Sequence, residues 1–151
     1  MEDTLDYHQI QGNIMLNYGD YGFIKARYLF IRIDNVNHGM EFVKNIWKFI
    51  TPTSSMMKIV LQDKVPPATT NIAFTYHGLQ RLGLPALTLQ SFPDEFIMGM
   101  NARRKILGDD KHSSPQHWDK IWKDFENIHI FISMEARNQA DLENRYNEII
   151  K

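Results

Sequence analysis

The chain has 151 residues, of which 43% are hydrophobic and 23% charged, and this length and composition suggest one globular domain with a real core. Its 17 basic and 18 acidic side chains give a net charge of −1, which argues against bulk electrostatic capture of nucleic acid or of an anionic membrane. It has no cysteine, which excludes disulfides, thiolate metal sites, iron–sulfur clusters and cysteine nucleophiles.

The N-terminus, Met-Glu-Asp-Thr-Leu-Asp, is acidic and lacks the apolar core of a signal peptide. No apolar run approaches the ~18 residues that a membrane-spanning helix needs. Together with the absence of cysteine, these features predict a cytoplasmic protein with no membrane partner. The range 1–27 is polar and rich in turn residues, and we interpret it as an N-terminal arm.

A strand and an amphipathic helix are expected next. Residues 28–33 are aromatic and branched, which is typical of a strand, and Asn35 can cap the helix that follows. The helix is indicated by apolar residues at spacings of 4, 3, 4 and 3, namely Val36, Met40, Val43, Trp47 and Ile50. Trp47 falls on this apolar face, so we expect it in the core. Pro52 is expected to end the helix.

The middle of the chain is less regular. Residues 51–68 are interpreted as a loop that has room for a short apolar strand at Met57–Leu61. A strand is predicted at 71–76 and a short helix at about 77–83. A further helical face is indicated by aromatic and apolar residues at spacings of four, namely Phe92, Phe96 and Met100.

The last third contains the clearest pattern. Residues 108–117 are predicted to form a polar loop, and residues 118–125 suit either a short helix or an aromatic hinge. Residues 128–134 alternate strictly between Ile or Met and other side chains, which predicts a strand. Asn138 or Asp141 can then cap a final helix.

The order of these elements is β-α-β-α-β-α, which predicts an α+β fold with helices on one face of an antiparallel sheet. It matches the ferredoxin-like pattern without the fourth strand. A missing strand leaves a row of unpaired backbone groups, and such an edge invites pairing with another chain. The expected partners are therefore a second copy of the chain or a complementary polypeptide.

A family resemblance rests on the order of several short blocks. They are Gln11-Gly12-Asn13, Thr70-Asn71-Ile72-Ala73-Phe74-Thr75, Gly78-Leu79, Leu82-Gly83-Leu84-Pro85, Ser91-Phe92-Pro93-Asp94-Glu95-Phe96, Leu107-Gly108-Asp109 and Trp118-Asp119. In this order the chain resembles the N-terminal half of a dye-decolorising (DyP-type) haem peroxidase, over roughly residues 6–136.

The resemblance implies a two-lobed enzyme with ferredoxin-like lobes, in which haem b sits largely in the second lobe. Residues 28–151 would be the first lobe. The family's Gly-x-x-Asp-Gly loop, distal Arg and haem-ligating His lie further downstream, so we assign no catalytic residue here and leave the cofactor-binding residues unknown. Gly12, Gly78 and Gly83 are then expected to serve tight turns or close packing, and Asn71 to cap or bridge backbone.

Histidine is the usual axial ligand of haem, and the chain has six: His8, His38, His77, His112, His117 and His129. None of them stands where the resemblance marks the haem ligand. His129 lies on the predicted strand beside Phe131, where a hydrogen-bonded sheet histidine is the expected reading. If two copies built a new haem pocket between them, His129 would be the first ligand candidate.

The polar loop contains the densest cluster of potential metal ligands: Asp109, Asp110, His112, His117 and Asp119. Its H-x4-H spacing matches no recognised zinc frame, so we expect no metal and interpret the residues as loop and capping groups. Asp109 follows a glycine but is not in a Gly-x-x-Asp-Gly loop, and we assign it no catalytic role. Ser113, Ser114 and His117 are close in sequence, which by itself does not define a catalytic triad.

The tryptophans and a short basic segment can each be interpreted as structural or as functional. Trp47, Trp118 and Trp122 could carry surface radicals in a peroxidase of this type, although packing explains Trp47 better. Arg103, Arg104 and Lys105 are read as a solvated helix face rather than as a binding patch.

Two functional hypotheses follow. In the first, the chain is the N-terminal domain or a fragment of a DyP-type peroxidase, inactive alone and complemented by a haem-carrying half for peroxide-dependent oxidation of dyes and other organic substrates. In the second, it is a non-catalytic ferredoxin-like module that dimerises through its open sheet edge.

Overall fold

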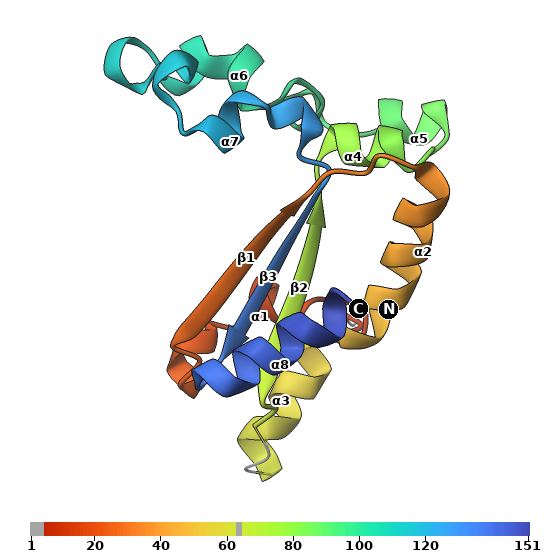
Figure 1. Cartoon of the computed structure of the whole chain (residues 1–151), viewed down its shortest axis with the longest axis vertical. Helices are drawn as coiled ribbons and strands as arrows, with labels where there is room; N and C mark the ends of the chain where they lie inside the picture. Colours follow the sequence, from red (N-terminus) through yellow and green to blue (C-terminus); the bar gives the residue numbers. More distant parts are fainter. Residues whose placement is uncertain (1–4, 63–64) are drawn as a thin grey trace. The chain divides into compact units, whose positions relative to one another are not determined.

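The computed structural model describes residues 5–62 and 65–151, which contain three strands and eight α-helices (Figure 1). The elements are α1 (Gly12–Met15), β1 (Lys25–Ile31), α2 (Val36–Ile46), α3 (Thr53–Gln62), β2 (Ala68–Phe74), α4 (Tyr76–Arg81), α5 (Ala86–Gln90), α6 (Asp94–Leu107), α7 (Lys120–Lys123), β3 (Ile130–Ala136) and α8 (Gln139–Ile149). Among the helices of these residues, none combines the length and the apolar character that crossing a membrane requires.

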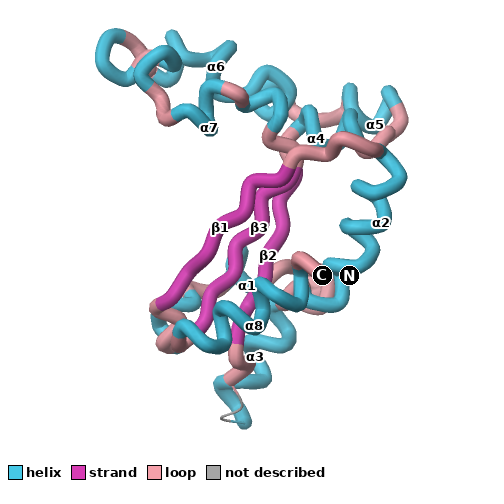
Figure 2. Tube along the Cα trace, viewed as in Figure 1, coloured by secondary structure: helices cyan, strands magenta, loops and turns pink. Residues whose placement is uncertain are grey.

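The three strands form one antiparallel sheet in the order β1-β3-β2 (Figure 2). The third strand of the chain therefore lies between the first two, as in a split βαβ arrangement. This confirms the predicted α+β, ferredoxin-like fold that lacks a strand.

The chain divides into two compact units. The first comprises Met1–Leu29, Phe42–Ile72 and Ile132–Lys151, and the second comprises Phe30–Glu41 and Ala73–Phe131.

In the first unit, α8 lies on one face of the sheet (Figure 1). Its Arg145 donates to the Thr70 hydroxyl of β2 at 2.8 Å, and its Glu143 receives two hydrogen bonds from Arg27 of β1. Asn138 caps the helix by accepting from the Asp141 N–H at 2.9 Å, which confirms one of the two predicted caps. Leu142 and Ile149 are buried and turn the apolar side of the helix towards the core.

The alternating segment predicted as a strand is β3, although the strand begins at Ile130 rather than at residue 128. Ile130, Ile132, Met134 and Ala136 are completely buried. On the opposite face Ser133 is also buried, whereas Phe131 and Glu135 are half-buried. The pattern thus predicted the more deeply buried face correctly.

The prediction that Trp47 packs in the core is wrong. Helix α2 ends at Ile46, and Ile46 is 3% exposed whereas Trp47 is 73% exposed. Met40, on the same predicted face, is 56% exposed. The buried side of the helix consists of Gly39, Val43 and Ile46. The predicted helical spacing was therefore correct, but Gly39 and Ile46 take the buried positions that were predicted for the residues directly after them.

The interpretation of residues 51–68 as a loop is also wrong. Residues 53–62 form α3, and Met57–Leu61, read as a candidate strand, belong to this helix. Pro52 directly precedes the helix and its carbonyl accepts from the Met56 N–H, so the proline begins one helix as well as following another. The β-branched residues at the end of α3 obscured the helix in the sequence.

Residues of the predicted N-terminal arm contribute to the fold. Tyr18 and Phe23 are 3% and 4% exposed and pack with Met56, and β1 begins at Lys25, inside the range assigned to the arm. The Tyr18 hydroxyl and the Asn71 side-chain amide are hydrogen-bonded at 2.9 Å. Asn71 therefore bridges to a side chain rather than to backbone. Residues 1–4 lie outside the described residues, and the boundary between 27 and 28 stays a prediction.

The outer edge of β2 is capped by side chains of the same unit. The Gln11 amide donates to the Ile72 carbonyl and accepts from the Ile72 N–H, both at 2.8 Å. Thr51 does the same for Thr70: its N–H donates to the Thr70 carbonyl at 2.9 Å, and its hydroxyl accepts from the Thr70 N–H at 3.0 Å. Four backbone groups that could otherwise pair with another strand at this edge are thus satisfied.

We expect Gln11→Ala to lower the free energy of unfolding by about 1–3 kcal/mol, because it leaves both backbone groups of Ile72 without their partners. Urea unfolding followed by circular dichroism would measure the loss. Gln9→Ala is the matched control, since the Gln9 amide bonds only to the exposed Asp6 carboxylate. Equal stability of the two variants would contradict the role given to Gln11.

Candidate functional site

His129 forms the buried polar centre of the second unit. Its Nδ1 accepts from the Ile33 N–H at 2.7 Å, and its Nε2 lies 3.1 Å from the Glu126 carbonyl. Because Nδ1 accepts from a backbone donor, the ring is neutral with its proton on Nε2, which donates to Glu126. Burial lowers the pKa of His129 most, the hydrogen bond to the Glu126 carbonyl partly opposes this change, and the nearby positive charge of Arg81 lowers the pKa further. Both ring nitrogens are engaged, as predicted for a hydrogen-bonded histidine, but His129 lies directly before β3 and not on the strand.

Gly78 packs directly against the backbone of His129. A Cβ at this position would lie 2.7 Å from the His129 carbonyl carbon and closer still to its oxygen. Thr75 holds the junction together: its hydroxyl donates to the Ile128 carbonyl at 2.6 Å and accepts from the Gly78 N–H at 2.9 Å, which caps α4. Thr75 and Gly78 thus hold the start of α4 against the backbone that precedes β3.

The other predicted glycines have comparable roles. In the first unit, a Cβ on Gly12 would lie 3.2 Å from Met56 Cγ and closer still to the Tyr18 hydroxyl. Gly83 adopts a φ of 81° after α4. These positions confirm the prediction of close packing for Gly12 and of a tight turn for Gly83.

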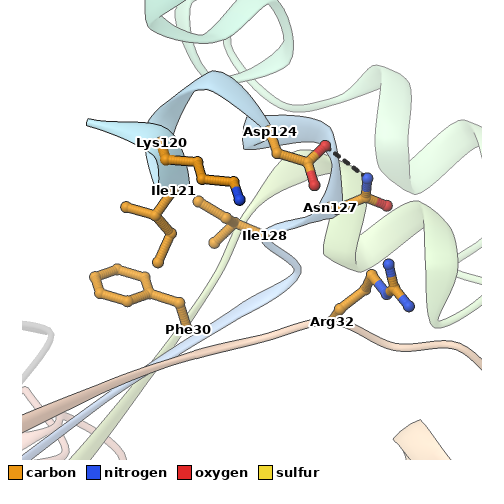
Figure 3. Close-up of a pocket in the computed structure, with 7 residues that line it drawn as sticks. All are labelled: Phe30, Arg32, Lys120, Ile121, Asp124, Asn127 and Ile128. Carbon is orange, nitrogen blue, oxygen red and sulfur yellow. Dashed lines mark hydrogen bonds between the residues drawn. The ribbon is translucent and has the colours of Figure 1, made fainter. Parts of the chain in front are cut away.

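An open hollow of about 560 Å³ lies in the second unit, between the end of β1 and the segment that contains α7 (Figure 3). We call it the α7 hollow. Its lining comprises Phe30, Arg32, Lys120, Ile121, Asp124, Asn127 and Ile128. Phe30 is fixed by Trp122, whose ring meets it edge-on at 4.9 Å between centroids, and by Phe131 at 5.2 Å.

The α7 hollow combines an apolar wall with three charged groups. Arg32 Nε lies 2.7 Å from an Asp34 carboxylate oxygen, in an ion pair that is largely exposed. The Asp124 carboxylate accepts from the Asn127 amide at 2.7 Å. Lys120 forms no ion pair with any of the described residues. The lining itself carries two cations and one anion and contains no nucleophile paired with a base.

The predicted acidic and histidine cluster does not converge in the structure. The His112 and His117 rings are 6.5 Å apart between centroids, on two exposed 3₁₀ turns. Within residues 5–62 and 65–151, no group of three or more His, Cys, Asp or Glu side chains is arranged to hold a metal ion. Asp109 has one buried carboxylate oxygen with no described partner. Asp119 precedes α7 without capping it through its side chain.

The described residues do not fit a haem. His129 has both nitrogens engaged, and His8 is hydrogen-bonded to the Ser54 hydroxyl at 2.9 Å. His8 lines a second hollow, beside Trp47 in the first unit, which has about 200 Å³ and is thus below the roughly 300 Å³ of small ligand pockets. His77 touches the rings of Tyr76 and Phe125. No histidine lines the α7 hollow.

The remaining predicted groups are placed separately. Trp118 donates to the Ser113 carbonyl at 2.9 Å, Trp122 is 41% exposed against Phe30, and Trp47 is exposed. The Ser114 hydroxyl donates to the Lys111 carbonyl and not to His117. Arg103, Arg104 and Lys105 lie on α6, where Arg104 bonds the Asn101 carbonyl.

Helix α6 presents apolar side chains that its own unit does not bury. None of the described residues of α6 is buried, and Ile106, Met100 and Met98 are 78%, 63% and 50% exposed. Gly99 breaks the helix with φ 65° and ψ 179°, so the continuous face predicted from Phe96 to Met100 is interrupted. An apolar helix of this kind is typical of a surface that meets a partner.

Sequence reasoning missed the residues that build the α7 hollow. Arg32 follows a strand, and Lys120 begins a four-residue helix far along the chain. Only the folding of the second unit brings them to one place. Neither residue lies in a local sequence motif. Only a prediction of which strand contacts which helix could have brought the two residues together.

Comparison with known families gives one match. Residues 9–151 match a family model described as the DyP dimeric alpha+beta barrel domain. A comparison with curated proteins found no match.

Solved structures give a consistent picture. An ancestral D-type dye-decolorizing peroxidase is 26% identical to this chain, with a TM-score of 0.76. The match covers 96% of this chain and 30% of the ancestral peroxidase. The DyP-type peroxidase of Anabaena sp. is 19% identical with a TM-score of 0.80, covering 96% and 32%. A decolorizing peroxidase from Auricularia auricula-judae is 19% identical with a TM-score of 0.74, covering 96% and 30%. The chain thus spans about a third of the length of these proteins.

Proposed function

Because the chain belongs to the DyP dimeric α+β barrel domain family and corresponds to the N-terminal domain of a DyP-type peroxidase, we propose that it completes a haem peroxidase together with a haem-carrying half. The complete assembly would oxidise dyes or other organic substrates with hydrogen peroxide. The observation that carries this proposal is the family match over residues 9–151. We further propose a cytoplasmic location, which the absence of cysteine suits.

The apolar surface of α6 supports the need for a complementary half. Met98, Met100 and Ile106 are each at least half exposed. Burying them against a partner would remove apolar area from water at roughly 25 cal/mol per Å². Their exposure agrees with a domain that reaches its final surface only in an assembly.

In this proposal the residues of this chain hold its own elements in place and form the surface that meets the second half. The bound haem would supply the peroxide chemistry. The buried His129 and the close contact at Gly78 fix α4 against β3, and α6 offers the surface for the second half. None of the described residues is assigned to the axial position, since the histidines are engaged or lie away from a pocket of haem size.

A second copy of the chain is the alternative partner, and the description of the family as dimeric favours it. Such a pair would be a non-catalytic ferredoxin-like assembly. Size-exclusion chromatography with light scattering separates the cases. A monomer at micromolar concentration would reject the homodimer and leave the complementary half as the partner.

The proposal is tested in a chimera. Residues 9–151 would replace the matching segment of the ancestral D-type peroxidase, and the chain alone would be titrated with haem in parallel. We expect no saturable Soret shift for the chain alone, but haem binding and peroxide-dependent dye oxidation by the chimera. A saturable haem site in the chain alone, with peroxide turnover, would overturn the need for a second half.

The role of α6 has its own control. Met98→Glu with Ile106→Glu should lower the chimera's activity or its haem occupancy by about tenfold, since each charge would be buried at an apolar interface. Lys105→Gln lies on the same helix and is expected to stay within about twofold. Equal activity of both variants would show that α6 does not contact the haem-carrying half.

A further inference from the structure

Gly99 breaks α6 with a backbone conformation that residues with a side chain rarely adopt. Its φ of 65° and ψ of 179° lie in a region that is almost restricted to glycine. The helix contains no proline, so the break originates at this glycine. Gly99 thus divides α6 into a first segment, residues 94–98, and a second segment, residues 100–107.

No close neighbour among the described residues forces a glycine at this position. A Cβ at Gly99 would meet none of their atoms within 4 Å, apart from its chain neighbours and the backbone of its own helix. At Gly78, by contrast, a Cβ would lie 2.7 Å from the His129 carbonyl carbon. Gly99 is therefore needed for the shape of the backbone and not for close packing.

The break is unfavourable for the chain alone. Each end of a helical segment leaves backbone groups without intrahelical partners, so two short segments are less stable than one helix of 14 residues. Packing does not compensate for this loss, because none of the described residues of α6 is buried. We therefore expect the compensation to come from a partner that contacts the helix.

The two segments of α6 differ in how they are held. Phe96, in the first segment, contacts the rings of Tyr76 in α4 and of Phe92. Met100 and Ile106, in the second segment, are both more than half exposed. The first segment is thus attached to its own unit, whereas the second presents apolar side chains that a partner can bury.

We propose that Gly99 sets the second segment of α6 in the orientation that docks against the haem-carrying half. The inference rests on the proposed peroxidase assembly and assigns Gly99 as the positioning residue within α6. The partner is the part of a DyP-type peroxidase that this chain does not match, since the match covers 30% of the ancestral peroxidase. Burial of Met100 and Ile106 against that part would offset the cost of the broken helix.

Gly99→Ala in the full chain tests the conformation. Alanine disfavours a positive φ but favours helix, and the open surroundings of residue 99 accept a methyl group. We therefore expect α6 to become one continuous helix, so that the Cα chemical shifts of Met98 and Met100 move to helical values in NMR. The midpoint of thermal unfolding should be no lower than that of the parent chain, which also shows that the variant is folded.

Gly83→Ala is the matched control. Gly83 has a φ of 81° and equally open surroundings, but it follows α4 and does not divide a helix. Pro85 disfavours continuation of α4, so alanine at residue 83 keeps the strain of a positive φ. We expect a lower unfolding midpoint and unchanged shifts of Met98 and Met100.

The role in docking is tested in the chimera with the ancestral D-type peroxidase. Gly99→Ala should lower its peroxide-dependent dye oxidation by about tenfold, because a straightened helix would turn Met100 and Ile106 away from their contacts. Gly83→Ala leaves α6 unchanged and should stay within about twofold.

Three results would overturn the role of Gly99. They are an equally active Gly99→Ala chimera, an equal loss of activity in both variants, and shifts of Met98 and Met100 that stay non-helical in the Gly99→Ala chain. An inactive parent chimera would instead reject the assembly on which this inference rests.

Discussion

Gly78→Ala is expected to lower the free energy of unfolding by about 3 kcal/mol or more, because the new methyl group would overlap the backbone of His129. The obstacle is a carbonyl group in a hydrogen-bonded strand connection, which cannot rotate away as a side chain can. The Thr75 cap holds α4 on the other side of the contact. Urea unfolding followed by far-ultraviolet circular dichroism measures the loss.

Gly19→Ala is the control for this substitution. A Cβ at Gly19 would meet its nearest neighbour, the Asn17 side-chain oxygen, at 3.4 Å, which is ordinary contact. We expect a change of less than about 1 kcal/mol there. A Gly78→Ala protein as stable as Gly19→Ala would show that α4 and β3 are not held at the distance seen in the structure.

The second large effect is a pH dependence that originates at His129. Burial lowers the pKa of this imidazole in the folded state below the ordinary value of about 6.5 that it has when unfolded. The unfolded chain therefore binds more protons at acidic pH. The stabilising contribution is complete above about pH 6.5 and is lost as the pH falls towards the folded pKa, with a slope of at most about 1.4 kcal/mol per pH unit. Protonation would also place an N–H of the ring against the Ile33 N–H.

His129→Asn isolates this contribution. The Asn side-chain oxygen can accept from Ile33 in place of Nδ1, but it does not titrate. We expect a lower stability than that of the parent chain at pH 7.5 and a flatter profile between pH 7 and pH 5. Parallel profiles of the two proteins, measured by urea unfolding at each pH, would assign the acid sensitivity to other groups.

Local patterns predicted the elements that pack most regularly. The alternation around Ile130, Ile132 and Met134 gave β3, and Asn138 gave the start of α8. The first signal arises because one face of the strand is buried along its whole length. The second arises because the Asn138 side chain accepts a hydrogen bond from the Asp141 N–H at the start of the helix. The order of the elements was then enough to predict a ferredoxin-like α+β fold without its fourth strand.

The errors have a different physical origin. In the sequence, Trp47 continues the helical spacing of apolar residues that begins at Val36. In the structure the helix ends at Ile46, and the exposed Trp47 ring lies beyond it. Pro52 was read only as a stop, although a proline also suits the position before a helix such as α3. The local sequence does not show where the first helix ends or whether Pro52 ends or begins a helix. Both depend on which side of the helix the rest of the chain covers.

The candidate site was the least predictable part. His129 could be predicted as a hydrogen-bonded histidine, but its position directly before β3 and its partners at Ile33 and Glu126 depend on the tertiary fold. The α7 hollow joins Arg32 and Lys120 from elements far apart in the chain. Periodicity reports on one element at a time, so it does not reveal where two elements meet.

The capped edge of β2 also limits how copies of this chain can add to one another. A fibre that grows strand by strand needs two different open edges on each molecule, so that the contact repeats without closing. Gln11 and Thr51 occupy the acceptors and donors of Ile72 and Thr70, which removes head-to-tail growth at that edge. The other edge strand of the described sheet is β1, and a contact of β1 with β1 would close at two molecules. Gln11 and Thr51 therefore oppose polymerisation through the β2 edge while still permitting a pair.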